Sequence, residues 1–423
     1  MTSRFSESCA KLGGRSSTAG LALATLLMPA VAAAQSPSIH FQVLHRFHGR
    51  NGAEPTATLI LDAAGNLYGG TDQGGDLNCT YNPNGCGTIF QLSATGQEKV
   101  LHRFKGPDGL LPEFQGSLSE DAQGNLYGDA PFGGDFSCSN GCGTVFKVDP
   151  TGKETTLYAF TGGADQTNPL GGVILDKSGN LYGTASDYFN TGYGDGTVFK
   201  VDSTGHETTL YTFLGINSGD GSLPDGLVAD AAGNFYGATA AGGISCPDGK
   251  NGGCGTIFKL DTTGKEKVLY SFTGTPGDGA KPTCTLVLDA EGNLYGTTIE
   301  GGASDVGTVF KFSTTTGKEK ILHSFNGTDG YQPYDAVVFD ASGNLYGTTL
   351  GGGSFGYGTV YELTTTGKER VLHNFSGGRD GSNPLAGLAI DGSGSLYGTT
   401  ETGGDLQCTA VQGGCGVVFK ITP

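Results

Sequence analysis

Residues 61–71 read LDAAGNLYGGT, and six close copies of this stretch follow along the chain. The copies read LSEDAQGNLYGDA, ILDKSGNLYGTA, VADAAGNFYGAT, VLDAEGNLYGTT, VFDASGNLYGTT and AIDGSGSLYGTT. The first glycine of the shared motif recurs every 51 to 59 residues, at Gly65, Gly124, Gly179, Gly233, Gly292, Gly343 and Gly394. A period of this length is typical of propellers and solenoids, in which each copy is one supersecondary unit.

Each repeat contains four runs in which apolar and polar residues alternate, as they do in half-buried strands. In the fourth repeat these runs are GLVAD, NFYGATA, GTIFKLD and EKVLYSF, and we name them A, B, C and D. The DxxGN motif between A and B predicts a tight turn, because its Asp can accept bonds from backbone amides and its Gly tolerates a positive φ. We therefore interpret seven Asp residues as turn formers: Asp62, Asp121, Asp176, Asp230, Asp289, Asp340 and Asp391.

The turn between C and D, written TGKE or a near copy, occurs only six times. The repeats begin with a D run, HFQVLHRF, and end with a C run, GVVFKITP. The sequence therefore predicts an all-β fold in which residues 35–423 form one seven-bladed β-propeller with four antiparallel strands per blade. The last blade takes its outer strand from the N-terminus, so Val43–Phe47 is expected beside Val417–Ile421. The 77 glycines and the 15% of charged residues agree with many short strands.

Residues 1–34 have the features of a secretory signal peptide, with cleavage expected after Ala34. Arg4, Lys11 and Arg15 precede the apolar run AGLALATLLMPAVA. Removing this segment leaves 21 Lys and Arg against 40 Asp and Glu. The sequence thus predicts a secreted protein, extracellular or periplasmic, whose negative charge disfavours nucleic acid and anionic membranes as partners. No other segment approaches the roughly 20 apolar residues that span a bilayer.

The succession DxxGNLYGTT, GG, GTVFK, TGKE, LYxF and DGxxP resembles the GloVer tandem repeat family over essentially all of residues 40–423. That resemblance implies a secreted or surface protein of unassigned biochemistry, because the exported members of the family carry varied C-terminal anchors. The chain departs from this pattern since it ends at FKITP, inside the last blade, without an anchor segment.

In a propeller whose strands A to D run outward, the BC and DA loops emerge on one face and the AB and CD turns on the other. The turns are nearly identical, whereas the loops vary in length and composition. Variable loops on a fixed scaffold usually carry binding. Aromatic side chains there could stack on a sugar or a partner chain, and packing within the loops is the alternative. The candidate ligand-binding residues are Tyr188, Phe189, Tyr193, Tyr331, Tyr334, Phe355 and Tyr357.

Eight of the ten cysteines form pairs that each lie within one BC loop, and export favours disulfides. The pairs are Cys79 with Cys86, Cys138 with Cys142, Cys246 with Cys254, and Cys408 with Cys415. Zinc is the alternative, but no His accompanies these pairs in the loops. Cys284, in an A strand, is expected to be a buried thiol, with an intermolecular link as the alternative.

Histidine occupies one D-strand position that Tyr fills in other repeats, which favours packing over catalysis. Four repeats have His at this position, namely His45, His102, His323 and His373, and three have Tyr, namely Tyr158, Tyr211 and Tyr270. Five Asp residues precede Gly in the DA loops, where they either form turns or present carboxylates to a cation or sugar: Asp108, Asp220, Asp278, Asp329 and Asp380. Calcium is possible, but no EF-hand or RTX loop is present, so no cofactor is expected.

Several enzyme classes are excluded by absent residues. The chain has no Trp, which removes quinoprotein, sialidase and kelch propellers, and no GxSxG, HExxH, P-loop or dinucleotide-binding motif appears in a strand-turn-helix context. The sequence predicts an exported, monomeric, non-catalytic binding or scaffold propeller whose ligand, a protein or a carbohydrate, sits on the BC and DA loop face. The alternatives are an extracellular lyase or hydrolase of polymers, with acidic residues at the mouth of the central channel, and a structural surface component.

Overall fold

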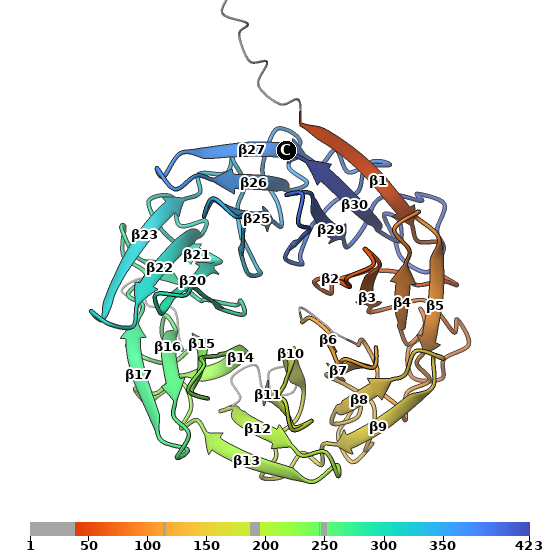
Figure 1. Cartoon of the computed structure of the whole chain (residues 1–423), viewed down its shortest axis with the longest axis horizontal. Helices are drawn as coiled ribbons and strands as arrows, with labels where there is room; N and C mark the ends of the chain where they lie inside the picture. The colour runs from red at the N-terminus through yellow and green to blue at the C-terminus, as the bar shows by residue number, and fades with distance from the viewer. Residues whose placement is uncertain (1–38, 113–115, 187–194, 245, 247–251) are drawn as a thin grey trace, which may run out of the picture. The chain divides into compact units, whose positions relative to one another are not determined.

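The computed structural model describes residues 39–112, 116–186, 195–244, 246 and 252–423, and this part of the chain contains strands, turns and bends but no helix. Seven four-stranded antiparallel sheets lie around a central axis as the blades of a propeller (Figure 1). The A strands are nearest the centre and the D strands form the outer edge. The predicted all-β, seven-bladed propeller is confirmed.

Within each blade the strands follow the order A, B, C, D. Blade 1 contains β2 (Ile60–Leu61), β3 (Leu67–Thr71), β4 (Thr88–Leu92) and β5 (Glu98–Arg103), and blade 2 contains β6 (Ser119–Glu120), β7 (Leu126–Ala130), β8 (Thr144–Val148) and β9 (Glu154–Ala159). Blade 3 contains β10 (Pro169–Leu175), β11 (Leu181–Ala185), β12 (Thr197–Val201) and β13 (Glu207–Thr212), and blade 4 contains β14 (Ser222–Ala229), β15 (Phe235–Ala241), β16 (Thr256–Leu260) and β17 (Glu266–Ser271).

The second half of the ring repeats this plan. Blade 5 contains β19 (Val287–Leu288), β20 (Asn293–Thr298), β22 (Thr308–Ser313) and β23 (Lys318–Ser324), with the short pair β18 (Gly279–Ala280) and β21 (Glu300–Gly301) joining its DA and BC loops. Blade 6 contains β24 (Val338–Phe339), β25 (Leu345–Thr349), β26 (Thr359–Leu363) and β27 (Glu369–Asn374), and blade 7 contains β28 (Ala389–Ile390), β29 (Leu396–Thr400), β30 (Val417–Thr422) and β1 (His40–Arg46).

The two ends of the chain close the ring in blade 7. Strand β1 pairs antiparallel with β30, and Phe41 lies opposite Ile421. Figure 1 shows β1 as the outer strand of the blade that β28, β29 and β30 begin. The N-terminal strand therefore completes the last sheet, as the sequence predicts, and protects an edge that would otherwise be unpaired.

Neighbouring blades are joined by a repeated pair of aromatic rings. A buried aromatic residue just after each D strand meets one in the C strand of the next blade, with ring centroids 5.0 to 5.3 Å apart and planes at 62° to 75°. The pairs are Phe47 with Phe90, Phe104 with Phe146, Phe160 with Phe199, Phe213 with Phe258, Phe272 with Phe310, Phe325 with Tyr361, and Phe375 with Phe419. Such edge-to-face pairs add about 0.5 to 1.5 kcal/mol each beyond their buried area.

The AB turns have the structure expected from DxxGN. In blade 1, Asp62 Oδ1 accepts bonds from the amides of Ala64 and Asn66 at 2.8 Å, and Gly65 has a φ of 84°. The sequence did not reveal that Asp62 Oδ2 also accepts a bond from the Tyr68 hydroxyl at 3.1 Å. Burial opposes ionisation of Asp62, but the bonds from Asn66 and Tyr68 outweigh it and lower its pKa. The turn Asp of every other blade is held in the same way.

Every D strand carries a β-bulge at the same position, and the residue left unpaired is a Leu. In blade 5, Val309 pairs with His323 and Phe310 pairs with Ile321, so Leu322 has no partner. A bulge bends a strand and changes the direction of its side chains. The His or Tyr that follows the bulge can therefore reach the DA loop.

Candidate functional site

The DA loops are bound on both sides by BC loops. Leu110 N donates to Phe132 O at 2.9 Å within the blade that the DA loop enters, and Leu111 N donates to Cys86 O at 3.4 Å in the preceding blade. The same double connection occurs at the entrance of blade 6, where Tyr331 N donates to Gly351 O and Gln332 N donates to Val306 O, both at 2.9 Å. The loops thus form one hydrogen-bonded face rather than separate projections.

The residue before the DA-loop proline has a positive φ in all seven blades. These residues are Glu54, Leu111, Asn168, Leu223, Lys281, Gln332 and Asn383, with φ between 53° and 58°. A non-glycine residue in this region costs about 1 kcal/mol or more, and such strain gathers at functional sites. The seven side chains belong to five residue types, so this ring gives the loop face an irregular composition on a regular backbone.

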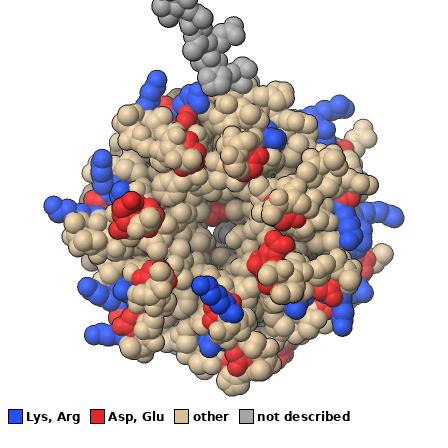
Figure 2. Space-filling view, in the orientation of Figure 1, with Lys and Arg blue, Asp and Glu red and all other residues tan. Residues whose placement is uncertain are grey.

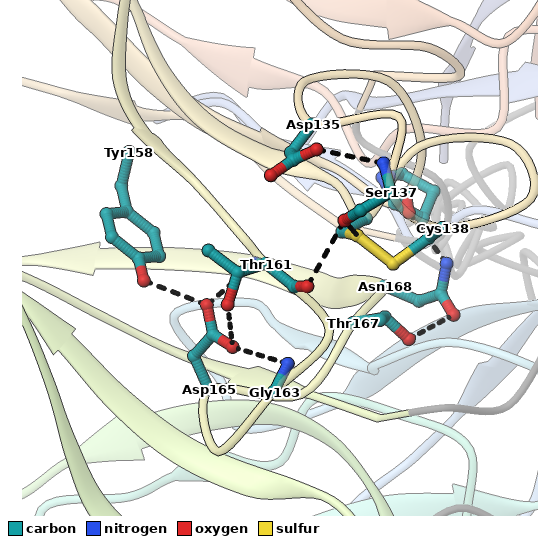
Figure 3. The surroundings of a disulfide bond; sticks show 11 residues. Asp135, Ser137, Cys138, Tyr158, Thr161, Gly163, Asp165, Thr167 and Asn168 are labelled. Atoms are coloured by element: carbon teal, nitrogen blue, oxygen red, sulfur yellow. Dashed lines mark hydrogen bonds between the residues drawn. A yellow bond between two sulfur atoms is a disulfide. The ribbon is translucent and has the colours of Figure 1, made fainter.

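Disulfides join the four loop cysteine pairs. In each pair the second cysteine also accepts a backbone bond from the positive-φ residue of the next DA loop: Cys86 from Leu111, Cys142 from Asn168, Cys254 from Lys281, and Cys415 from Glu54. Figure 3 shows the Cys138–Cys142 disulfide beside the DA loop, where Ser137 Oγ donates to Thr161 O at 3.4 Å. Each disulfide therefore holds the junction between two neighbouring loops.

The candidate aromatic residues divide into two groups. Tyr188, Phe189 and Tyr193 lie outside the described residues. Among the others, Phe355 is 60% exposed, Tyr357 is 45% exposed and Tyr331 is 37% exposed, and Tyr334 is half-buried. The ring of Tyr331 covers Gly351, and that of Tyr357 covers Gly377, because a Cβ at either glycine would meet the ring within 2.7 Å. Two of the three exposed rings, those of Tyr331 and Tyr357, therefore rest on the loop backbone.

Sequence reasoning missed a second aromatic group, which lines a pocket between blades 1 and 2. Tyr81 and Phe136 stack with centroids 4.2 Å apart and planes at 15°, although they belong to different BC loops. They are 47% and 38% exposed. The pocket has a volume of about 220 Å³, and the other residues that line it are Asn82, Leu110, Leu111, Phe132, Ser139 and Asn140. Tyr81 lies between Cys79 and Cys86, so an aromatic residue inside a disulfide-closed loop was the available signal.

The polar groups of this pocket retain hydrogen-bonding capacity. Asn82 Oδ1 accepts the amide of Asn84 at 3.0 Å, which leaves its side-chain nitrogen available. Within the described part of the chain, the side chains of Ser139 and Asn140 have no hydrogen-bond partner. None of the eight lining residues is Asp, Glu, Lys, Arg or His. The pocket thus combines aromatic and aliphatic side chains with neutral donors and acceptors, and its lining carries no charge.

The Asp residues of the DA loops face the D strand. The His or Tyr after each bulge contacts the carboxylate at 2.7 to 3.3 Å. The contacts join His102 to Asp108, Tyr158 to Asp165, Tyr211 to Asp220, Tyr270 to Asp278, His323 to Asp329, and His373 to Asp380. In blade 7, Asn51 takes the place of Asp and lies 3.0 Å from His45, whose pKa burial lowers to about 4. The His residues therefore do more than pack, since they position the loops.

The carboxylates near the central channel bear on the alternative that the protein is an enzyme with acidic residues at the mouth of that channel. Asp335 accepts bonds from Ala336 N at 2.6 Å, Gly387 N at 2.7 Å and the Thr58 hydroxyl, so it connects blade 6 to blades 7 and 1. Loss of solvation, and then the charge of Asp335, raises the pKa of Asp225 to about 7. Carboxylates with raised pKa values can act as acids or bases. The bonds of Asp335 nevertheless indicate a structural role for that residue.

Cys284 lies on the inner side of blade 5 and is 1% exposed. Its sulfur accepts a bond from Thr297 N at 3.2 Å, and burial raises the pKa of the thiol to about 12. Because a thiolate is the reactive form of cysteine, this position suits a buried, unreactive thiol rather than an intermolecular link.

Comparison with known proteins identifies the repeat. A family model described as the Gloeobacter/Verrucomicrobia repeat matches residues 31–195 and 171–412. The chain belongs to this family. The predicted resemblance is confirmed, and the two matched segments together cover every described strand of the seven blades except β30. No curated protein matches the chain.

Solved structures share the fold at low sequence identity. The extracellular domain of a one-component system from B. thetaiotaomicron is 13% identical with a TM-score of 0.53, over 91% of this chain and 42% of that one. The nidogen/laminin complex gives 16% identity and a TM-score of 0.43, over 69% of this chain and 91% of that one. A gluconolactonase from Xanthomonas campestris gives 14% identity and a TM-score of 0.40, over 73% and 86%. The first similarity concerns the fold alone, and no conclusion is drawn from the other two, whose TM-scores are below 0.5.

Among the residues that the structure describes, there is no helix long and apolar enough to cross a membrane. Lys and Arg project mainly from the outer rim, whereas Asp and Glu lie between the rim and the centre (Figure 2). The net charge of the full chain is −17.

Proposed function

We propose that this protein is an exported, non-catalytic binding propeller that recognises a neutral sugar unit in the pocket between blades 1 and 2. The observation that carries the proposal is the pairing of exposed Tyr81 and Phe136 above uncharged polar side chains. A pyranose ring has an apolar C–H face, which suits an aromatic wall, and a rim of hydroxyls, which suits Asn and Ser side chains. Removal of residues 1–34 on export and a monomeric state remain part of this proposal.

The size and charge of the pocket limit the range of ligands that it could bind. Pockets for drug-sized ligands have volumes of about 300 to 1,000 Å³, and the pocket here is smaller, at about 220 Å³. It therefore suits a single ring, such as a terminal or branching residue of a longer glycan. Because the lining residues carry no charge, and the chain is strongly acidic, neutral sugars are favoured over uronic acids and sulfated polymers.

The proposal is tested by screening the purified protein on an array of neutral and acidic glycans, followed by calorimetry with each glycan that binds. The double variant Tyr81→Ser/Phe136→Ser should lose binding while its melting temperature stays within a few degrees of the parent's, because exposed loop changes cost about 0.5 kcal/mol or less. The matched control is Phe355→Ser/Tyr357→Ser, two blades away on the same face, which should bind as the parent does. Capture of acidic glycans only, or of a protein with no glycan, would refute the sugar assignment.

A second candidate, a channel hydrolase or lyase, is favoured by one observation. The pKa of Asp225 is raised to about 7, and burial and the neighbouring Asp225 also raise the pKa of Asp129. A carboxyl group of this kind can donate a proton near neutral pH. Chromatography of glycans incubated with the parent and with Asp225→Asn separates the two candidates, because cleavage by the parent alone would establish the enzyme.

A further inference from the structure

Two clusters between blades combine one imidazole with two carboxylates. His102, Asp108 and Glu154 form the first, and His323, Asp329 and Glu369 form the second. In each cluster, one ligand atom from each residue lies within 4.8 Å of the other two. The His and Asp come from one D strand and the loop after it, whereas the Glu begins the D strand of the next blade. The clusters are therefore interblade contacts.

The second cluster is held in place from several sides. His323 Nε2 lies 3.1 Å from Asp329 Oδ2, and its ring packs edge-to-face on Phe325 with centroids 4.8 Å apart. Asn326 donates its backbone amide to Asp329 Oδ1 at 2.9 Å and its side-chain nitrogen to Asp329 Oδ2 at 2.8 Å. Asp329 is only 8% exposed. The two bonds from Asn326 thus fix Asp329 from outside the cluster, as outer hydrogen bonds typically fix metal ligands.

Glu369 supplies the observation that points to a ligand. Its Oε1 is buried and has no hydrogen-bond partner in the described part of the chain. The equivalent Oε1 atoms of Glu98, Glu266 and Glu319 also lack a partner there, and among these four residues Glu369 is the one grouped with a His and an Asp. Buried polar atoms are nearly always satisfied, and an exception often marks an ion or water. A cation shared with Asp329 would satisfy the oxygen and remove the repulsion between the two carboxylates.

We propose that His323, Asp329 and Glu369 bind one divalent transition-metal ion of the Zn²⁺ class, which connects blade 5 to blade 6. One imidazole and two carboxylates suit Zn²⁺, whereas Ca²⁺ takes oxygen ligands. Three protein ligands leave a fourth position for water. The first cluster, which contains Glu154, should bind the metal ion more weakly than the second, because Glu154 Oε1 already accepts a bond from the Thr156 hydroxyl at 2.9 Å.

The other blades supply natural variants that each lack one ligand. In blade 4, Tyr270 replaces His and donates to Asp278 at 3.0 Å, beside Glu319 of blade 5. Figure 3 shows the same Tyr arrangement in blade 2, where Tyr158 donates to Asp165. After blade 6, Phe41 stacks on His373 at 3.7 Å, at the register where the other D strands have Glu. The fold thus tolerates each replacement, so these changes are suitable tests.

The experiment uses purified protein that has been dialysed against EDTA and then titrated with ZnCl₂ in competition with a chromogenic chelator. The parent should bind one Zn²⁺ tightly and melt at a higher temperature with the metal than without it. Glu369→Gln should weaken that binding by at least about tenfold, since even the loss of an outer-shell partner costs 10- to 100-fold. His323→Tyr should abolish it while melting, without metal, within a few degrees of the parent.

The control is His373→Tyr, which changes the same D-strand position in a blade with no third ligand and should leave Zn²⁺ binding unchanged. Three results would overturn the proposal. The parent could show no tight binding, His323→Tyr could bind as the parent does, or His102→Tyr could remove the tight site while His323→Tyr retains it. A loss of binding in His323→Tyr that is accompanied by unfolding is resolved by Glu369→Gln, which preserves the shape of the site.

Discussion

The two faces of the propeller use the same backbone for different purposes. On the AB face, one Asp in each blade accepts the same set of bonds from the turn and from the Tyr two residues after the turn Asn or Ser. On the loop face, four of the seven BC loops contain disulfides, and the positive-φ position before the DA-loop proline is filled by five different residue types. Features repeated seven times are explained by the backbone, whereas the irregular features are the candidates for the selective binding that we propose.

The largest expected effect concerns closure, which depends on the N-terminal strand alone. Deleting residues 35–48 removes β1 and exposes the edge of β30, so cooperative unfolding should be lost. Circular dichroism during heating is the measurement, and adding a synthetic peptide of residues 39–48 should restore part of the transition. A truncated protein that melts like the parent would show that closure does not require this strand.

A second prediction tests whether the repeated interblade pairs are equivalent. Phe272→Ala removes one ring of the pair with Phe310 and leaves a cavity in a fully buried position. The free energy of unfolding should fall by about 3 to 5 kcal/mol. Phe104→Ala, at the equivalent position three interfaces earlier in the ring order, should cost the same within about 1 kcal/mol. Denaturant titration measures both, and a large difference would mean that the blades are not energetically equal.

The fold could be predicted because the period, the six CD turns and the split last blade can all be read directly from the sequence. The roles of the turn Asp residues could be predicted for the same reason. The pocket could not be predicted, since Tyr81 and Phe136 belong to different repeats and meet only when neighbouring loops are placed side by side. The same limit applies to Glu369, which joins His323 and Asp329 from the next blade. Contacts between repeats depend on the blade-to-blade geometry, which the sequence of one repeat does not contain.

A third prediction uses pH to separate the AB turns from the interblade contacts. The turn Asp residues have lowered pKa values, so their contribution is present at neutral pH and is lost as the pH falls below about 4. Burial, and then a neighbouring Asp, raises the pKa of Glu266 and Glu319 to about 7, so their contribution is full below about pH 4.5 and is lost as the pH rises toward 7. The melting temperature of metal-free protein should therefore be highest near pH 4 to 5, within about one unit.

The interblade part of this pH profile can be isolated with Glu319→Gln. The neutral side chain keeps the size of Glu but cannot ionise, so the melting temperature should fall less between pH 5 and pH 8 than it does in the parent. The acidic limb below pH 4 should not change, because the turn Asp residues are untouched. A stability maximum at pH 8 in the parent would show that these glutamates are not held in a desolvating environment.

The smallest expected effect is a difference in stability between two variants. One is altered on the loop face of blade 6 and the DA loop that leads into it, and the other in the AB turn of the same blade. Replacing Tyr331, Phe355 and Tyr357 together by Ser alters three exposed rings of the loop face, and each such change should cost about 0.5 kcal/mol or less. Asp340→Ala removes a single acid from the AB turn of the same blade, where it accepts bonds from Ser342 N, Asn344 and the Tyr346 hydroxyl. Because bonds to a charged group contribute about 1.5 to 3 kcal/mol, this one change should destabilise the protein more than the triple variant. Differential scanning calorimetry of the two variants decides the matter: if the triple variant proves the less stable, those aromatic residues hold the loops together, and the exposed area of the loop face cannot be taken as a sign of binding.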